Sequence, residues 1–359
     1  MTLPILSPDS AAVSQGERGQ LQVSVQLVIL LRLALVLCGA VLTGCAARHS
    51  GGHPDTHGPH PVDSTGAPST QDRYRASDGS HFPFRTWLPL SKSEPSIVIV
   101  ALHGISGASR DFTVLGKHLQ ESMESIAVYA PELRGQGYDP VKQRRGDIRS
   151  REEWFKDLQT FTRMVRQRHP QALVIWCGES MGALIVLHGL ASAPDAELTC
   201  DALILSSPIV GIHEDVPAWK RLLLRPLSTV LPRIRISLEA LAGKEEVQVT
   251  KESIHQEQAE HNPYHIPTFT LRLLATLGSM IESSPRCARR ITRPVLILHG
   301  GYDIFSRSTA IESFTQEFPH SGKVTRQFYP ESYHLLFYDH QREEVLSDLS
   351  QWIHSLDLP

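Results

Sequence analysis

The chain has 359 residues, of which 41% are hydrophobic and 20% are charged, and its formal net charge is −3. This composition is typical of a globular protein and excludes the strongly basic domain that a nucleic-acid-binding protein would need. None of the five cysteines forms a CxxC pair, so the sequence contains no cysteine-based metal motif.

An apolar segment lies near the N-terminus. After Arg32, its uninterrupted part extends only from Leu33 to Leu42. A membrane-spanning helix needs about 20 apolar residues, whereas the core of a signal peptide needs about 7 to 15. We therefore expect residues 1–44 to be a signal peptide. The long polar leader before this core suggests that translation starts later, near Val25.

The signal peptide ends in Leu42-Thr43-Gly44-Cys45, which resembles the bacterial lipoprotein box. The resemblance implies cleavage before Cys45 and lipidation of this cysteine, so that the exported protein is held on a membrane. Because Ala46 rather than Asp follows, the expected place in a Gram-negative bacterium is the periplasmic side of the outer membrane. An N-terminal anchor that is never cleaved is the alternative.

Residues 45–72 separate this motif from the rest of the chain. They are rich in Gly, Pro, Ser, Thr and His and lack the apolar residues that a core requires, so we expect a flexible tether. Nothing in such a segment preorganises its histidines for a metal ion. The folded body is expected to span residues 73–359.

Six short runs in this body combine apolar and β-branched residues, the last of them being more polar. Near-continuous apolar character indicates strands that are buried on both faces, as in a parallel sheet. Helical patterns separate the runs, notably in residues 151–169 and 342–356, so the sequence predicts an α/β fold with a mostly parallel central sheet flanked by helices. The runs are residues 96–104, 125–132, 172–180, 201–208, 294–303 and 323–332.

The alternation stops between Pro208 and Arg293. Two helical patterns broken by prolines replace it, and the segment is too long for a loop. We expect residues 209–291 to form a helical cap over the sheet. Its first part combines leucines with several arginines, which suits either contact with anionic lipid or ordinary packing on the sheet.

A Gly-x-Ser-x-Gly pentapeptide stands where the third apolar run meets a helix, with Ser180 between Gly178 and Gly182. In this context the pentapeptide is typical of a nucleophile elbow, in which a strained turn exposes the serine hydroxyl at the sheet edge. An ordinary strand-to-helix junction is the alternative.

The partners of such a serine follow it in the order acid, then histidine. Asp303 comes just after the fifth run, and His334 comes just after the sixth. Both are therefore expected at the same sheet edge as Ser180. The competing residues are His299, His340, Asp339 and Asp348.

Two backbone N–H groups would complete the site as an oxyanion hole. Met181 directly follows the serine, and Ile105 lies in the Gly-rich loop after the first run. A plain glycine-rich turn is the alternative for this loop.

The body as a whole resembles the monoacylglycerol lipase and lysophospholipase branch of the α/β-hydrolase superfamily, the S33-type hydrolases. The matching pieces are "LHGISG", "APELRGQGYDP", "CGESMGA", "LSSPIV", "PVLILHGGYDIFS" and "YHLLF", which run from about Ser96 to the C-terminus. The resemblance implies a cap inserted after the sixth strand, a catalytic Ser-His-Asp triad and no cofactor. Glu179 before the serine, where animal members have histidine, and Glu132, where many members have aspartate, depart from the pattern.

Three functions follow from these observations. The leading hypothesis is a serine hydrolase that cleaves carboxylic esters of lipids, either monoacylglycerols or lysophospholipids, at a membrane that it reaches through Cys45 and through the cap. An exopeptidase of the prolyl-aminopeptidase type would use the acidic residues Glu239, Glu245 and Glu246 in the cap. A surface lipoprotein without activity is the third. The oligomeric state and the pairing of Cys200 with Cys287 stay open.

Overall fold

The computed structural model describes residues 72–193, 199–211, 226–237, 250, 265–319 and 323–356. The chain divides into two units, Met1–Ser69 and Thr70–Pro359. The predicted signal peptide, with Cys45, and the tether up to Gln71 lie outside the described residues.

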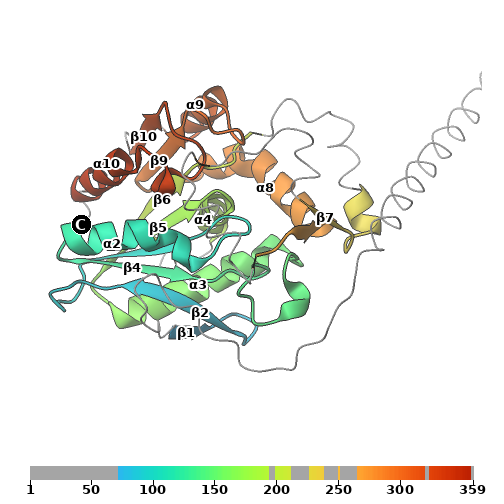
Figure 1. Cartoon of the computed structure of the whole chain (residues 1–359), viewed down its shortest axis with the longest axis horizontal. Coiled ribbons are helices and arrows are strands. Elements are labelled where there is room, and N and C mark those ends of the chain that lie inside the picture. Colours follow the sequence, from blue (N-terminus) through green and yellow to red (C-terminus); the bar gives the residue numbers. More distant parts are fainter. Residues whose placement is uncertain are drawn as a thin grey trace, which may run out of the picture. The chain divides into compact units, whose positions relative to one another are not determined.

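An eight-stranded sheet forms the centre of the second unit (Figure 1). Its spatial order is β1-β2-β4-β3-β5-β6-β9-β10, and all pairs from β4 to β10 are parallel, whereas β1 and β2 add an antiparallel hairpin at one edge. The strands are β1 (Asp72–Arg75), β2 (His81–Trp87), β3 (Ile97–Leu102), β4 (Ile126–Pro131), β5 (Leu173–Glu179), β6 (Ala202–Ser206), β9 (Val295–Gly300) and β10 (Val324–Tyr329).

The six runs predicted from the sequence correspond to β3, β4, β5, β6, β9 and β10, so the prediction of a parallel α/β sheet is confirmed. Every residue of β4, β6 and β9 is buried, as expected for strands covered on both faces. The hairpin of β1 and β2 was not predicted.

Helices cover both faces of the sheet (Figure 1). Alternate strand residues such as Val98, Val100 and Val174 face one apolar cluster, which α3 (Arg151–Arg168), α4 (Met181–Ser192), α8 (Leu271–Ala288) and α9 (Ser308–Gln316) share. Ile99 and Ile175 face a second cluster, which α2 (Thr113–Ser122) and α10 (Arg342–His354) complete. The predicted helices correspond to α3 and α10.

The segment predicted as a cap is described in part. Residues 226–230 form one helical turn, and β7 (Arg235–Ser237) pairs with β8 (Thr268–Thr270) in a separate two-stranded sheet. Helix α8, at the end of the same range, packs against α4 in the main body, where His188 donates a hydrogen bond to the Met280 carbonyl (2.9 Å). Residues 212–225, and 238–264 apart from Thr250, lie outside the described residues.

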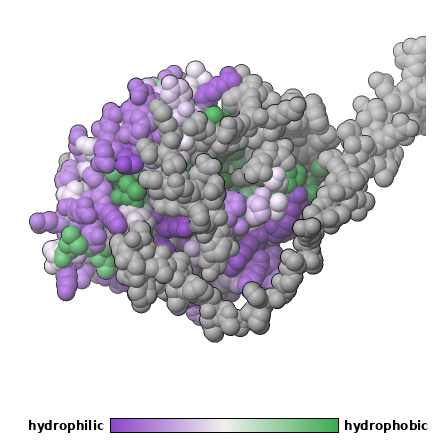
Figure 2. Space-filling model, viewed as in Figure 1, coloured by the Kyte–Doolittle hydropathy of each residue, from purple (hydrophilic) through white to green (hydrophobic). Residues whose placement is uncertain are grey.

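The described surface is mostly hydrophilic on the face seen in Figure 2, where hydrophobic residues occur in small separate groups. None of the helices in the described ranges is long and apolar enough to span a membrane.

Candidate active site

Ser180 occupies the sharp turn between β5 and α4. Its backbone lies in the left-handed region, with φ 55° and ψ −114°, and its N–H donates to the Ser206 carbonyl of β6 (3.0 Å). A Cβ atom at Gly178 would collide with the backbone of Gly182, and one at Gly182 would collide with the Leu102 carbonyl. Only glycine fits on either side, so the pentapeptide forms the strained elbow predicted from the sequence.

Asp303 and His334 follow the carboxyl ends of β9 and β10. The His334 Nδ1–H donates to Asp303 Oδ2 (2.9 Å), and the Phe305 N–H donates to Asp303 Oδ1 (2.8 Å). Both side chains are almost completely buried. The aspartate is therefore positioned to fix the orientation of the imidazole and to stabilise it when it is protonated.

The same sheet edge holds Ser180 and His334. Ser207, which follows the residue that binds the Ser180 N–H, donates its hydroxyl to the His334 carbonyl (2.6 Å). Within the described residues the Ser180 hydroxyl forms no hydrogen bond, to His334 or to any other side chain. Catalytic hydrogen bonds are often long before substrate binds and shorten in the complex, so this geometry is consistent with a serine–histidine pair.

The competing residues have other partners. His340 binds Asp339 (3.1 Å) and Glu331 (3.4 Å), and Asp348 accepts from the Tyr329 hydroxyl (3.1 Å). His299 is buried beside the Phe328 ring, and this burial lowers its pKa to about 4. Of the candidate histidines and acids, His334 and Asp303 are the ones that the structure joins next to the elbow.

The loop after β3 passes next to the serine. A Cβ atom at Gly104 would lie 3.2 Å from Ser180 Cβ, so glycine permits the close approach. Ser106 has φ 60°, and its N–H donates to Gln136 Oε1 (3.0 Å). The backbone N–H groups of Ile105 and Met181 donate to no acceptor in the described residues, which leaves both available to a ligand.

Behind this loop, the strand ends carry a row of buried polar residues that the sequence analysis did not assemble. Glu132 and His103 directly follow β4 and β3, and Glu179 pairs with Ser206 across β5 and β6. All four are at most 3% exposed. Each is the first polar residue after an apolar run, which is the sequence signal that could have revealed them.

This row holds the loop that carries Ile105. Glu132 Oε1 accepts from the N–H (3.1 Å) and the hydroxyl (2.6 Å) of Ser109, in η1 (Ser109–Phe112), and Asp111 Oδ2 accepts from the Ala108 N–H (2.8 Å). Burial opposes the charge of His103, but Glu132 at 3.5 Å outweighs it and raises the pKa of the imidazole. The loop is thus tied to the buried pair of Glu132 and His103.

Glu179 is the member of the row that directly precedes Ser180. Burial, reinforced by the negative charge of Asp111, raises the pKa of its carboxyl to about 8. Its Oε2 atom is buried and has no hydrogen-bond partner in the described residues. A neutral carboxylic acid therefore stands beside Ser180 at pH 7.

The three cysteines of the body, Cys177, Cys200 and Cys287, are free thiols, so Cys200 does not pair with Cys287. Cys287 lies 3.3 Å from Nδ1 of His188. In the described ranges no group of three or more His, Cys, Asp and Glu residues is arranged to hold a metal ion.

With this geometry in place, similarity to known proteins is informative. The model of the family described as "Serine aminopeptidase, S33" matches residues 93–341. The monoacylglycerol lipase of Mycolicibacterium smegmatis is 26% identical over 276 residues, which are 77% of this chain and 93% of that protein.

Two solved structures share the fold. The monoacylglycerol lipase of Paleococcus ferrophilus superposes with a TM-score of 0.64 at 21% identity, covering 76% of this chain and 98% of that one. A soluble variant of the monoglyceride lipase from Saccharomyces cerevisiae, in complex with a substrate analog, superposes with a TM-score of 0.67 at 18% identity and covers 82% and 97%.

Proposed function

The chain belongs to the serine aminopeptidase S33 family of α/β-hydrolases, and from this premise we propose that it is a serine hydrolase that cleaves carboxylic esters of lipids. The single observation that carries the proposal is the strained Ser180 elbow beside the His334–Asp303 pair. The similarity to a monoacylglycerol lipase favours monoacylglycerols as the substrate class, and lysophospholipids are the second class that we expect.

The roles of the residues follow from their positions. Ser180 Oγ attacks the ester carbonyl while Nε2 of His334 accepts its proton, and Asp303 holds Nδ1. The carbonyl oxygen becomes negatively charged and accepts from the N–H groups of Ile105 and Met181. The protonated imidazole then gives its proton to the leaving alcohol, and water, activated by the same histidine, hydrolyses the acyl-enzyme.

We also propose that the protein acts at a membrane. The lipoprotein box supports lipidation of Cys45 after export, and the arginine- and leucine-rich first part of the cap supports contact with anionic lipid. The expected location is the outer membrane, on its periplasmic side, if the bacterium has one.

The exopeptidase alternative would depend on Glu239, Glu245 and Glu246, which lie outside the described residues. Substrate comparison separates the two activities. Hydrolysis of aminoacyl amides at a higher kcat/KM than glycerol esters would contradict the ester proposal.

The direct test of the site is covalent labelling with a fluorophosphonate, followed by a panel of glycerol monoesters and lysophospholipids. Ser180→Ala should abolish labelling and lower turnover about 10⁴-fold or more, because no other side chain forms the acyl-enzyme. His334→Ala should have nearly the same effect, while His340→Ala serves as the matched control. Labelling that survives Ser180→Ala, or a larger loss in His340→Ala, would refute the assignment.

A further inference from the structure

Three serines with a left-handed backbone follow neighbouring strands of the sheet. In the described ranges four non-glycine residues have a positive φ, and three of them are Ser106 (60°), Ser180 (55°) and Ser207 (43°). They come after β3, β5 and β6, which are adjacent in the sheet. Serine adopts this backbone region only with strain, whereas glycine does not, so a serine at such a position points to a use for its hydroxyl.

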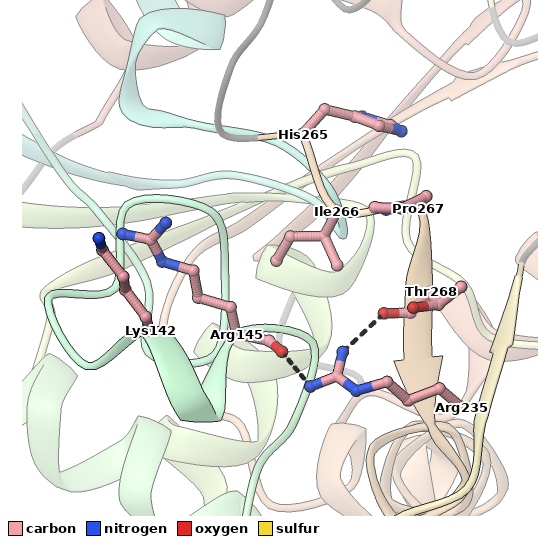
Figure 3. A pocket seen from close by; sticks show the side chains of 7 residues that line it. All are labelled: Lys142, Arg145, Arg235, His265, Ile266, Pro267 and Thr268. Atoms are coloured by element: carbon pink, nitrogen blue, oxygen red, sulfur yellow. Dashed lines mark hydrogen bonds between the residues drawn. The ribbon is translucent and has the colours of Figure 1, made fainter. Parts of the chain in front are cut away.

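The three hydroxyls have different roles. Ser180 supplies the proposed nucleophile. The Ser106 hydroxyl donates to the carbonyl of Ile266 (3.2 Å), which lies just before β8 and is one of the residues that line a small pocket there (Figure 3). The Ser207 hydroxyl donates to the carbonyl of His334 (2.6 Å). Ser207 is therefore the serine that contacts the residue expected to act as the general base.

Ser207 connects the backbone of the nucleophile to the backbone of the histidine. It is 1% exposed, and its N–H donates to the Leu298 carbonyl of β9 (2.9 Å). The residue before it, Ser206, accepts a hydrogen bond from the Ser180 N–H (3.0 Å). Two hydrogen bonds and the segment 206–207 thus join Ser180 to His334, whose side chains share no hydrogen bond in the described residues.

The aspartate loop is tied to the same part of the chain. Ser306, three residues after Asp303 and 2% exposed, donates its hydroxyl to the Pro208 carbonyl (3.1 Å) and accepts from the Val210 N–H (3.2 Å). Residues 206–210 therefore contact the loops of all three members of the expected triad. This matters for the rate, because a displacement of about 1 Å can lower catalysis about 100-fold.

We propose that Ser207 is a positioning residue of the catalytic site, and that its hydroxyl holds the His334 backbone where proton transfer from Ser180 requires it. The inference rests on the proposed ester hydrolysis by these residues. The Ser207 hydroxyl is buried and already bonded to a carbonyl, so it acts through His334 and not on the substrate. Its loss should lower kcat and leave KM unchanged.

The test compares two substitutions in the full chain that both remove this hydroxyl but differ in backbone strain. Ser207→Ala keeps a Cβ atom at a positive φ, whereas Ser207→Gly relieves the strain, so the glycine variant should melt at the higher temperature. On p-nitrophenyl butyrate, a short soluble ester, both variants should lose kcat about ten-fold at an unchanged KM. Their rates of labelling by a fluorophosphonate should fall by the same factor.

The matched control is Ser284→Ala, which removes a fully buried hydroxyl that donates to the Met280 carbonyl (2.9 Å) within α8. It should leave kcat and the labelling rate at wild-type values. If Ser207→Gly has the wild-type kcat, or if Ser207→Ala loses much more activity than the more stable glycine variant, the hydroxyl contributes only stability and the inference is wrong. A change in KM instead of kcat would also overturn it.

The wild-type protein separates this failure from a failure of the proposed function. If the wild type is labelled and hydrolyses the ester while the Ser207 variants equal it, the positioning inference alone is wrong. If the wild type is neither labelled nor active on any ester, the proposed ester hydrolysis fails, and the positioning inference fails with it.

Discussion

Glu179 is the residue of the buried polar row whose protonation is expected to make the activity of the site depend on pH. Its side chain is faced by Asp111 from η1 and by Tyr338 from η4 (Leu336–Tyr338). Burial and the Asp111 charge raise the pKa of Glu179 to about 8, so the carboxyl is neutral below that pH and anionic above it. An anion at this position would oppose the negative charge that develops on the ester oxygen.

We therefore predict that wild-type kcat declines as pH rises through about 8, and that Glu179→Gln, which cannot ionise, keeps its activity to higher pH. Stability should change in the same direction. Because the folded state raises the pKa of Glu179 from 4.5 to about 8, the wild type should lose unfolding free energy relative to Glu179→Gln as pH rises across that interval.

Rate profiles from about pH 6 to pH 10 measure the first effect, and denaturant midpoints across the interval from pH 4.5 to about 8 measure the second. Glu343→Gln is the control. The Glu343 carboxylate lies in α10 and is 81% exposed, and the substitution removes the same charge. Identical alkaline limbs in the wild type and Glu179→Gln would show that a group other than Glu179 sets the decline.

At the scale of elements, the strands that were predicted correctly are those buried on both faces, because such strands have no polar face. Runs such as residues 126–131 are buried throughout, and their unbroken apolar character distinguishes them from surface segments. Strand β1 is polar apart from Tyr74, and β2 contains Pro83, which argues against a strand. An antiparallel edge has a different sequence pattern from a parallel centre, so this hairpin was missed.

The site was predictable to the same extent. Ser180, Asp303 and His334 stand at strand ends and in a fixed order, so a single sequence sufficed to predict that they lie at one edge of the sheet. The grouping of Glu132, His103, Glu179 and Ser206 depends on which strands are neighbours in the sheet, and chain order does not reveal that β3 lies between β4 and β5.

The cap segment after Pro226 exposes apolar side chains. Val230 is 75% exposed and Leu231 is 37% exposed, at the end of the turn of helix 226–230. If this surface meets lipid, Val230→Ser combined with Leu231→Ser should lower the rate on vesicle-borne lipid esters roughly five-fold, because less apolar area is buried on binding. Short soluble esters should be cleaved at the wild-type rate.

The control for this prediction is Leu90→Ser, which alters an equally exposed apolar residue, 68% exposed, outside the cap. Turnover of vesicle-borne and soluble esters is compared alongside the melting temperature. Equal losses on both substrates with a lower melting temperature would mean that the two cap residues stabilise the fold and do not contact the membrane.

At the scale of the whole molecule, Cys45 is the residue expected to determine where the enzyme is located. We predict that Cys45→Ala releases the protein from the membrane fraction or blocks its maturation, since stable anchoring takes at least two acyl chains and lipoprotein processing would supply them. Its kcat/KM on soluble esters should not change, because the folded body is the same.

Mass spectrometry of the mature N-terminus and fractionation of cells decide this prediction. Cys38→Ala is the matched control, because it removes a cysteine from the part of the leader that cleavage would discard. A mature protein with an unmodified Cys45, or with its leader intact, would contradict lipidation.

The backbone of Ser180 has a thermodynamic consequence for the protein as a whole. A non-glycine residue held at φ 55° and ψ −114° costs on the order of 1–3 kcal/mol, a sizeable part of the about 5–15 kcal/mol by which folded proteins are stable. Glycine would adopt the same conformation without strain. A population of variants selected only for resistance to heating should therefore accumulate glycine at position 180 and lose hydrolysis. Selection for heat resistance and selection for turnover thus favour different residues at this position.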